Sequence, residues 1–220
     1  MPQPPSPLSA EIALAAARLI AQEGLDYASA KQKALQAITG TPRNTRALLP
    51  DNALIEVELR RWLITFDGAA HHRRLHALRT LALQLMQRLT LFAPHLTGAV
   101  LNGTATEHSD IHLQLFTDSA KDVEHFLLNE GVDFEVFEHA QAQELIQFVI
   151  KPARTRGIPP RVGVVLEVFA PQALHVAPRA YPAMGAHPID ARLTDVHPIE
   201  ISGRASAAQL QQLLTDTASL

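Results

Sequence analysis

The chain has 220 residues, 47% of them hydrophobic and 19% charged, which is the composition of a folded protein with a substantial core. It contains no cysteine, which excludes disulfide bonds, thiolate zinc sites and cysteine nucleophiles. The formal net charge of −3 argues against a general affinity for nucleic acid, because binding to its backbone requires a basic surface. No apolar run approaches the roughly 20 residues of a membrane span, and the first residues do not resemble a signal peptide. We therefore expect a cytoplasmic protein that does not bind membranes.

The first part of the chain is predicted to be helical over residues 8–93. Residues 1–7 are proline-rich and are expected to be disordered. Ser9 is expected to cap the first helix, because a serine hydroxyl accepts hydrogen bonds from the free amides of a helix N-terminus. Apolar residues recur at helical spacing in four segments, 10–23, 27–38, 51–66 and 70–92.

The pattern changes after Pro94, which ends the last of these helices. A helix is expected over 119–131 and a closing helix over 206–214, and the strand 161–169 is apolar enough to be central in a sheet and buried on both sides. The sequence thus predicts an α/β (α+β) fold, with a helical region followed by a small mixed β-sheet flanked by helices over residues 94–220. Strands are expected over 99–101, 109–117, 132–137, 143–150 and 161–169.

Polar and apolar residues alternate along the strand predicted at 109–117. Ile111, Leu113 and Leu115 lie on one side, whereas Asp110 and His112 lie together on the other. Residues two positions apart on a strand are about 7 Å apart on the same face, so this carboxylate and this imidazole are directed at one place. The spacing makes them candidate metal ligands.

A turn at Gly103-Thr104 lies shortly before this strand. Glycine lets backbone amides approach a ligand closely, and the threonine adds a hydroxyl group. The turn is therefore a candidate phosphate-binding loop next to the candidate metal ligands.

The residues Gly103-Thr104 followed by Ser109-Asp110-Ile111-His112-Leu113 resemble the signature of the nucleotidyltransferase superfamily, which includes DNA polymerase beta. In that family one strand ends in Gly-Gly or Gly-Ser, and the next strand carries Ser-Asp-Ile-Asp-Leu. The resemblance implies a nucleotidyltransferase-type sheet and implies that Gly103, Thr104 and Ser109 bind nucleotide. His112 stands where the family has its second aspartate.

The resemblance also implies a reaction in which divalent ions, Mg or Mn, hold a nucleoside triphosphate and stabilise transfer of its nucleotidyl group. Three carboxylates bind these ions in the family. Asp110 matches the first, His112 takes the place of the second, and the third is either Asp133 or Glu167. Asp133 follows the predicted helix, as in the smallest members of the family, and it is preferred because Glu167 could equally pair with an arginine. The expected metal ligands are therefore Asp110, His112 and Asp133. The acceptor, a small molecule or a protein, is unknown.

Three functions remain open from the sequence. The first is a nucleotidyltransferase-like protein that binds a nucleoside triphosphate with a divalent metal and passes a nucleotidyl group to an acceptor. The second is a catalytically inactive member of the same fold that serves as a binding or regulatory module. The third is a metal hydrolase with histidine and carboxylate ligands, which requires a second histidine near His112; the candidates are His108, His139 and His175.

Overall fold

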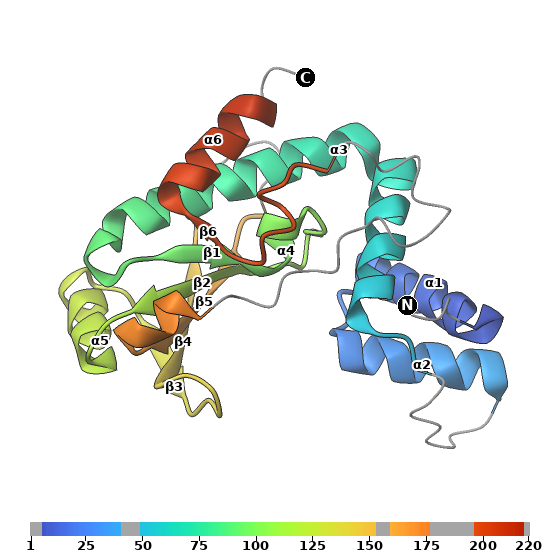
Figure 1. Ribbon diagram of the computed structural model, residues 1–220, viewed down its shortest axis with the longest axis horizontal. Helices are drawn as coiled ribbons and strands as arrows, with labels where there is room; N and C mark the ends of the chain where they lie inside the picture. Colours follow the sequence, from blue (N-terminus) through green and yellow to red (C-terminus); the bar gives the residue numbers. More distant parts are fainter. Residues whose placement is uncertain (1–5, 41–48, 153–158, 177–195, 218–220) are drawn as a thin grey trace. The chain divides into compact units, whose positions relative to one another are not determined.

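The computed structural model describes residues 6–40, 49–152, 159–176 and 196–217 (Figure 1). The described residues form two compact units, of which the first ends at His71 and the second begins at His72. The boundary therefore lies inside a helix, earlier than the division predicted between residues 93 and 94. The reason is that the second half of that helix contributes its apolar side chains to the core of the sheet.

The first unit contains α1 (Pro7–Glu23), α2 (Tyr27–Thr39) and the first part of α3 (Asn52–Arg88). The hydroxyl of Ser6, and not that of Ser9, caps α1, because it accepts a hydrogen bond from the Ser9 amide at 3.1 Å. Disorder was expected up to residue 7, but Ser6 and Pro7 belong to the start of this helix, and residues 1–5 lie outside the described ones. The core of the unit consists of Ile12, Ala13, Ala16, Ala17, Ile20, Ala30, Ala34, Leu35, Ile55, Leu59 and Leu63.

Helix α3 replaces the two helices predicted over 51–66 and 70–92. Its backbone leaves helical geometry at Gly68, where φ is 17° and ψ is −103°, so the two predicted segments are separated by a kink and not by a loop. Among the described residues, no helix combines the length and the apolar character that a membrane span requires.

The second unit is built on a sheet whose strands follow the order β3-β4-β5-β2-β1-β6. Strands β2 and β5 are parallel, and the other neighbouring pairs are antiparallel. The expected α/β class with a mixed sheet is confirmed, and the strand predicted at 161–169 is central in it. The strands are β1 (His95–Thr97), β2 (Ile111–Phe116), β3 (Phe134–Phe137), β4 (Glu144–Ile150), β5 (Val162–Phe169) and β6 (Ala205–Ser206).

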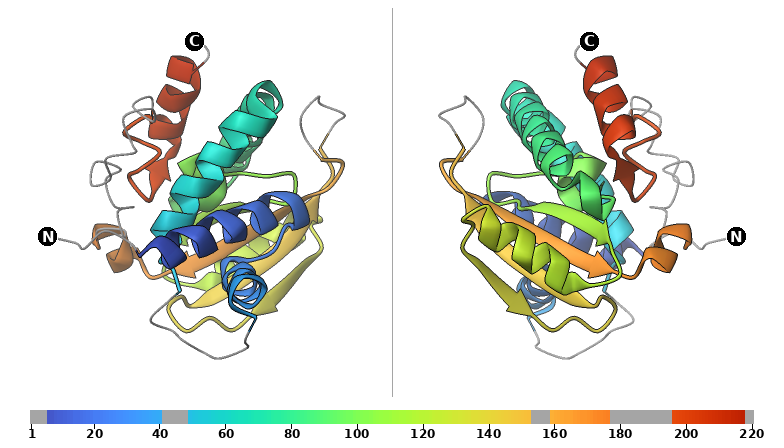
Figure 2. Two further views of the ribbon diagram at one scale, coloured as in Figure 1. Left: turned by 90° about the vertical axis from the view of Figure 1, so that its right-hand side faces the viewer. Right: turned by 90° about the vertical axis from the view of Figure 1, so that its left-hand side faces the viewer.

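Helices of this unit pack on one face of the sheet, where they bury Ile111, Leu113 and Leu115 of β2 in a single core. The right-hand view of Figure 2 shows α5 lying against the strands. The other helical elements of the unit are the second part of α3, η2 (Thr90–Phe92), α4 (Gly98–Asn102), α5 (Ala120–Asn129), η3 (Pro171–His175) and α6 (Ala207–Thr217).

One predicted strand is wrong. Residues 99–101 form part of the short helix α4, which ends at Gly103 in a left-handed conformation with φ of 80°. The apolar run Ala99-Val100-Leu101 is too short for its pattern to distinguish a strand from a buried helical turn. Glycine at the C-terminal end of a helix is common, because it adopts this conformation without a steric penalty.

Candidate functional site

The face of the sheet opposite to the helices carries the candidate site, and we call it the open face. Its members alternate along each strand with the core residues, as the register shows. Val165 and Phe116 lie on this face; both are buried, but they do not belong to the core cluster beneath the helices. The open-face strand positions are His95, Thr97, Asp110, His112, Gln114, Phe116, Glu135, Phe137, Leu145, Gln147, Val149, Gly163, Val165, Glu167 and Phe169.

Asp110 lies directly before β2 and is exposed. Its carboxylate rests on the backbone of Gly163, the neighbouring position on β5, so a Cβ atom at Gly163 would lie only 2.6 Å from Asp110 Cγ. Glycine is thus required at this position of β5 for the carboxylate to lie where it does.

His112 follows on the same face of β2 and is half-buried. Its ring lies close to Gly98 at the start of α4, since a Cβ atom there would be 3.6 Å from His112 Cβ and 3.7 Å from its Cγ. The hydroxyl of Thr97, opposite His112 on β1, donates a hydrogen bond of 3.5 Å to the His112 carbonyl oxygen. Asp110 and His112 therefore share one face, with a glycine beside each.

Glu167 lies on β5, the strand next to β2, but it pairs in register with Gln114 and not with Asp110 or His112. Its Oε2 atom accepts a hydrogen bond of 3.2 Å from the amide of Gln114. It lies four positions after Gly163, which is about 13 Å along the strand. Glu167 is therefore a carboxylate of the open face that lies too far along β5 to bind one metal ion together with Asp110.

Asp133 precedes β3 at the far edge of the sheet. The register places it in line with Asp110, but Val149 of β4 and Gly163 of β5 lie between them. Three strand spacings amount to about 14 Å, which is too far for one metal ion to bind both carboxylates. The preference for Asp133 as third ligand is therefore not supported by the order of the strands, and the described residues contain no group of three potential metal ligands.

The helix α5 leads from β2 to β3, but β4 and β5 lie between these two strands in the sheet. The neighbour of β2 is instead β5, which comes much later in the chain and pairs with it in parallel. This pairing explains why Glu167, and not Asp133, is next to β2.

The turn predicted to bind phosphate is directed inward. Thr104 is only 1% exposed, and its hydroxyl donates a hydrogen bond of 2.7 Å to Asn102 Oδ1. Gly103 is buried as the C-cap of α4. Ser109 accepts a hydrogen bond of 2.9 Å from the amide of Thr106, so its hydroxyl also stabilises a local turn. In this conformation the three residues support the chain around Asp110 without presenting a free phosphate-binding loop.

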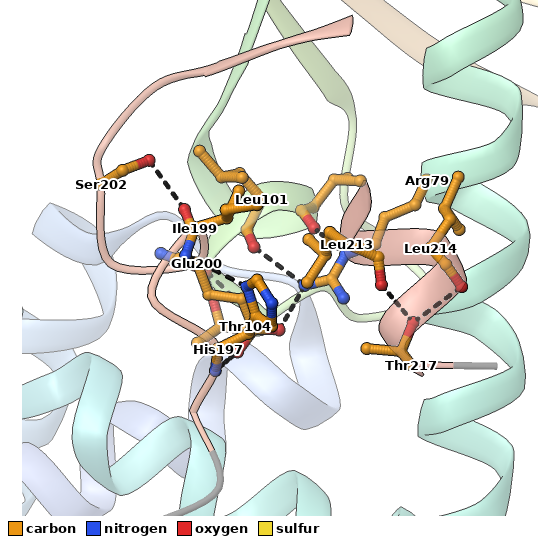
Figure 3. Close-up of polar contacts among 12 residues, drawn as sticks. Arg79, Leu101, Thr104, His197, Ile199, Glu200, Ser202, Leu213, Leu214 and Thr217 are labelled. Carbon is orange, nitrogen blue, oxygen red and sulfur yellow. Dashed lines mark hydrogen bonds and ion pairs between the residues drawn. The ribbon is translucent and has the colours of Figure 1, made fainter. Parts of the chain in front are cut away.

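Arg79 of α3 holds this turn in place, a role that the sequence does not reveal (Figure 3). Its guanidinium donates to the carbonyl oxygens of Val100 at 3.0 Å and Leu101 at 2.9 Å, at the C-terminal end of α4. It also forms an ion pair of 2.5 Å with Glu200, and both side chains are almost completely buried. The other carboxylate oxygen of Glu200 accepts a hydrogen bond from the amide of His197 at 3.3 Å. Arg79 thus connects α3, α4 and the segment before β6.

The opposite end of the open face is a packed aromatic cluster. The ring of Phe116 stacks on Phe169 at 5.9 Å and meets His95 edge-on at 5.5 Å, while the Arg204 guanidinium lies 5.2 Å above it. Burial, with a smaller contribution from the nearby Arg204 charge, lowers the pKa of His95, although a hydrogen bond to the Ala93 carbonyl opposes this. This end of the face is therefore closed, whereas Asp110 at the other end is exposed.

The three histidines considered as additional ligands lie in separate parts of the second unit. His108 is exposed in the loop before β2, and its imidazole lies 3.5 Å from the Glu107 carboxylate. His139 follows the edge strand β3, and His175 ends η3. They do not form a group with His112 that could hold a metal ion among the described residues.

Comparison of the chain with protein-family models, curated proteins and solved structures finds no match. The likeness to nucleotidyltransferases therefore stays a prediction that rests on the residues around Asp110.

Proposed function

We propose that this chain is a nucleotidyltransferase-like binding module that takes up a nucleoside triphosphate together with its divalent ion, Mg or Mn, on the open face. The observation that supports this most is the placement of Asp110 and His112 on one face of β2, next to Gly98 and Gly163. In this proposal the two side chains supply two metal ligands, and the phosphate oxygens and water supply the rest. Mg is commonly bound in this way, through one or two protein groups and a substrate phosphate.

Because the open face is negatively charged near Asp110, nucleotide binding should depend strictly on a divalent metal ion. Asp110, Glu135 and Glu167 are carboxylates, and none of the open-face strand positions carries Lys or Arg. The Arg204 guanidinium lies above Phe116, at the packed end of the face opposite to Asp110. A free triphosphate would be repelled by the carboxylates, and a divalent ion bound to the phosphates would neutralise that repulsion. The module should accordingly bind the nucleotide only together with the metal. With two protein ligands, it should hold the free ion only weakly.

Binding without transfer is the better-supported form of the proposal. Transfer by the family's mechanism needs three ligands that converge on two ions, but Glu167 is about 13 Å along β5 from Gly163, and Asp133 is about 14 Å across the sheet from Asp110. If the loss of one bridging carboxylate raises the barrier by about 4 kcal/mol, the rate falls roughly 10³-fold. We therefore expect no measurable release of pyrophosphate.

Thermal unfolding in the presence of each nucleoside triphosphate, with and without Mg, Mn or Zn, tests the proposal. A nucleotide at about 100 times its Kd should stabilise the fold by about 2.7 kcal/mol, and only when Mg or Mn is also present. Asp110→Asn and His112→Ala should abolish this shift. The matched controls are Asp118→Asn and His175→Ala, because both residues are exposed and lie away from Asp110 in the chain. A shift that persists in Asp110→Asn, or the absence of any shift with every nucleotide and metal, contradicts the proposal.

The variant His112→Asp distinguishes a binding module from an enzyme whose active site has lost one carboxylate ligand. Restoring a carboxylate at position 112 should strengthen binding of the metal–nucleotide complex, because a carboxylate suits Mg better than a neutral imidazole does. Pyrophosphate release by the wild-type chain at a rate typical of an enzyme would instead show that it is a transferase.

A further inference from the structure

Strand β3 ends the sheet on one side, and its outer edge has no neighbouring strand among the described residues (Figure 1). Its inner edge pairs with β4 in a continuous antiparallel register from Phe134 to Phe137. An edge strand presents a row of backbone amides and carbonyls that can pair with a further strand. At the other end of the sheet, β6 is only two residues long and continues directly into α6, which limits such pairing.

The edge of β3 lacks most of the features by which proteins block strand addition. The strand contains no proline and no lysine, and its register with β4 has no bulge. Two of its apolar side chains are also accessible, since Val136 is 42% and Phe137 is 43% exposed. Successive side chains point to opposite faces of a strand, so an added strand would find an apolar neighbour on each face.

The charged residues of β3 and of the positions directly before and after it are all negative. Asp133, Glu135 and Glu138 are exposed, and none of them forms an ion pair or a side-chain hydrogen bond with another described residue. Together with the strand, these residues define what we call the acidic edge, residues 133–138. A strand paired with the acidic edge would place its own side chains next to these carboxylates.

These charges discriminate between the possible occupants. If a second copy of the chain paired antiparallel with β3, with Phe134 of one copy opposite Val136 of the other, Glu135 of each copy would lie opposite Glu135 of its partner. Like charges in directly opposite positions destabilise a strand pair, whereas opposite charges stabilise it. The acidic edge is therefore unsuited to self-association and suited to an extended segment that carries Arg or Lys.

We propose that the acidic edge is a docking site for a basic, extended segment of a partner protein, which adds to the sheet as a strand next to β3. Backbone hydrogen bonds would provide affinity for any extended segment, whatever its sequence. The pairing of Arg or Lys with Asp133, Glu135 and Glu138 would provide the selectivity for basic segments. This surface is separate from Asp110 and His112, since β4 and β5 lie between β3 and β2. The proposal therefore does not depend on nucleotide binding.

The experiment uses the full chain and a short peptide of alternating arginine and valine, with a peptide of alternating glutamate and valine for comparison. Backbone amide signals followed by NMR should shift at residues 133–138 with the basic peptide and not with the acidic one. The double variant Glu135→Lys/Glu138→Lys should weaken binding of the basic peptide at least about tenfold and favour the acidic peptide. The matched control Glu11→Lys changes the charge of an exposed residue in the first unit and should leave the affinity unchanged.

Four results would overturn the proposal. Signals that shift away from residues 133–138 would place the peptide elsewhere, and equal affinity of the wild type and the double variant would remove the role of the charges. No binding of the basic peptide to the wild-type chain, whose folding is verified by its own spectrum, would exclude the docking site. Concentration-dependent shifts at residues 133–138 without peptide, together with a dimer in sedimentation, would show that a second copy occupies the edge.

Discussion

The two faces of the sheet in the second unit have the same backbone but different surroundings. On the helix-covered face, Leu113 is completely buried in a continuous apolar core. On the open face, the next residue, Gln114, is half-buried and forms a polar contact with Glu167. Neighbouring residues of one strand therefore serve different purposes: the covered face stabilises the fold, and the open face presents side chains to a ligand.

The largest effect is expected for Arg79, which lies on the helical side of the sheet. Arg79→Ala leaves Glu200 buried without its ion pair and removes the donors to the α4 carbonyls, so the free energy of unfolding should fall by about 3–5 kcal/mol. Chemical denaturation measures this change. The control Arg88→Ala removes an exposed ion pair with Glu130 and should cost less than about 1 kcal/mol. Equal losses in the two variants would contradict the structural role of Arg79.

A pair of adjacent substitutions on β2 compares the faces directly. Leu113→Ala should lower the free energy of unfolding by about 2–5 kcal/mol, because it leaves a cavity in the core. Gln114→Ala should lower it by about 1 kcal/mol or less, since only one hydrogen bond to a partly accessible carboxylate is lost. A larger loss for Gln114→Ala than for Leu113→Ala would mean that the two faces have been assigned the wrong way round.

The alternation along β2 is also the feature that the sequence predicted best. Ile111, Leu113 and Leu115 are buried as expected, because side chains on a strand repeat every two residues whatever the rest of the fold does. The neighbour of β2 could not be predicted in the same way. Strand pairing depends on contacts distant in sequence, and β5 pairs with β2 although Asp133 and β3 come first along the chain.

The sequence near a residue did not predict its role where two interpretations were equally compatible with it. Ser6 and Ser9 are both suitable caps for α1, and only the structure shows that Ser6 is the one used. The role of Thr104 could not be predicted for a related reason, since a Gly-Thr turn looks the same in sequence whether its hydroxyl faces solvent or donates to Asn102. Arg79 carries no sequence signal for its role, because its partner Glu200 is remote in the chain.

Gly163→Ala should impair binding of the metal–nucleotide complex on the open face with little effect on the free energy of unfolding. The added methyl group would overlap the Asp110 carboxylate and displace it, while position 163 is not part of the core beneath the helices. We expect a change of about 1 kcal/mol or less in the free energy of unfolding, together with a loss of binding to the metal–nucleotide complex. Gly131→Ala is the comparison, because nothing lies within 4 Å of the added atom, although its φ of 68° makes the variant locally strained. Unchanged nucleotide binding in Gly163→Ala would contradict the role of Asp110.

The smallest effect is expected from His95, at the packed end of the open face. Because its pKa is lowered in the folded chain, the unfolded chain binds more protons around pH 6.5. The stability should therefore fall as the pH drops through this region, and His95→Asn should reduce that fall. Thermal unfolding between pH 5 and pH 8 measures it.

The measurement on His95 is best made in a Glu56→Gln background. Burial raises the pKa of Glu56, in the first unit, to about 7, so its contribution has the opposite sign and the stability decreases as the pH rises from about 4.5 to 7. Removing this group isolates the effect of the histidine. An unchanged pH dependence after His95→Asn in that background would contradict the expected contribution.

The proposed function depends on binding of a metal–nucleotide complex to the open face at Asp110 and His112. Paramagnetic broadening of backbone amide signals by Mn with a nucleoside triphosphate tests it most directly, because broadening reports proximity to the ion. The signals of residues 110–112 and 163–165 should broaden first, Mn without nucleotide should have little effect, and Asp110→Asn should remove the broadening. Broadening that is strongest elsewhere, or that is the same with and without nucleotide, would contradict binding of the complex at Asp110 and His112.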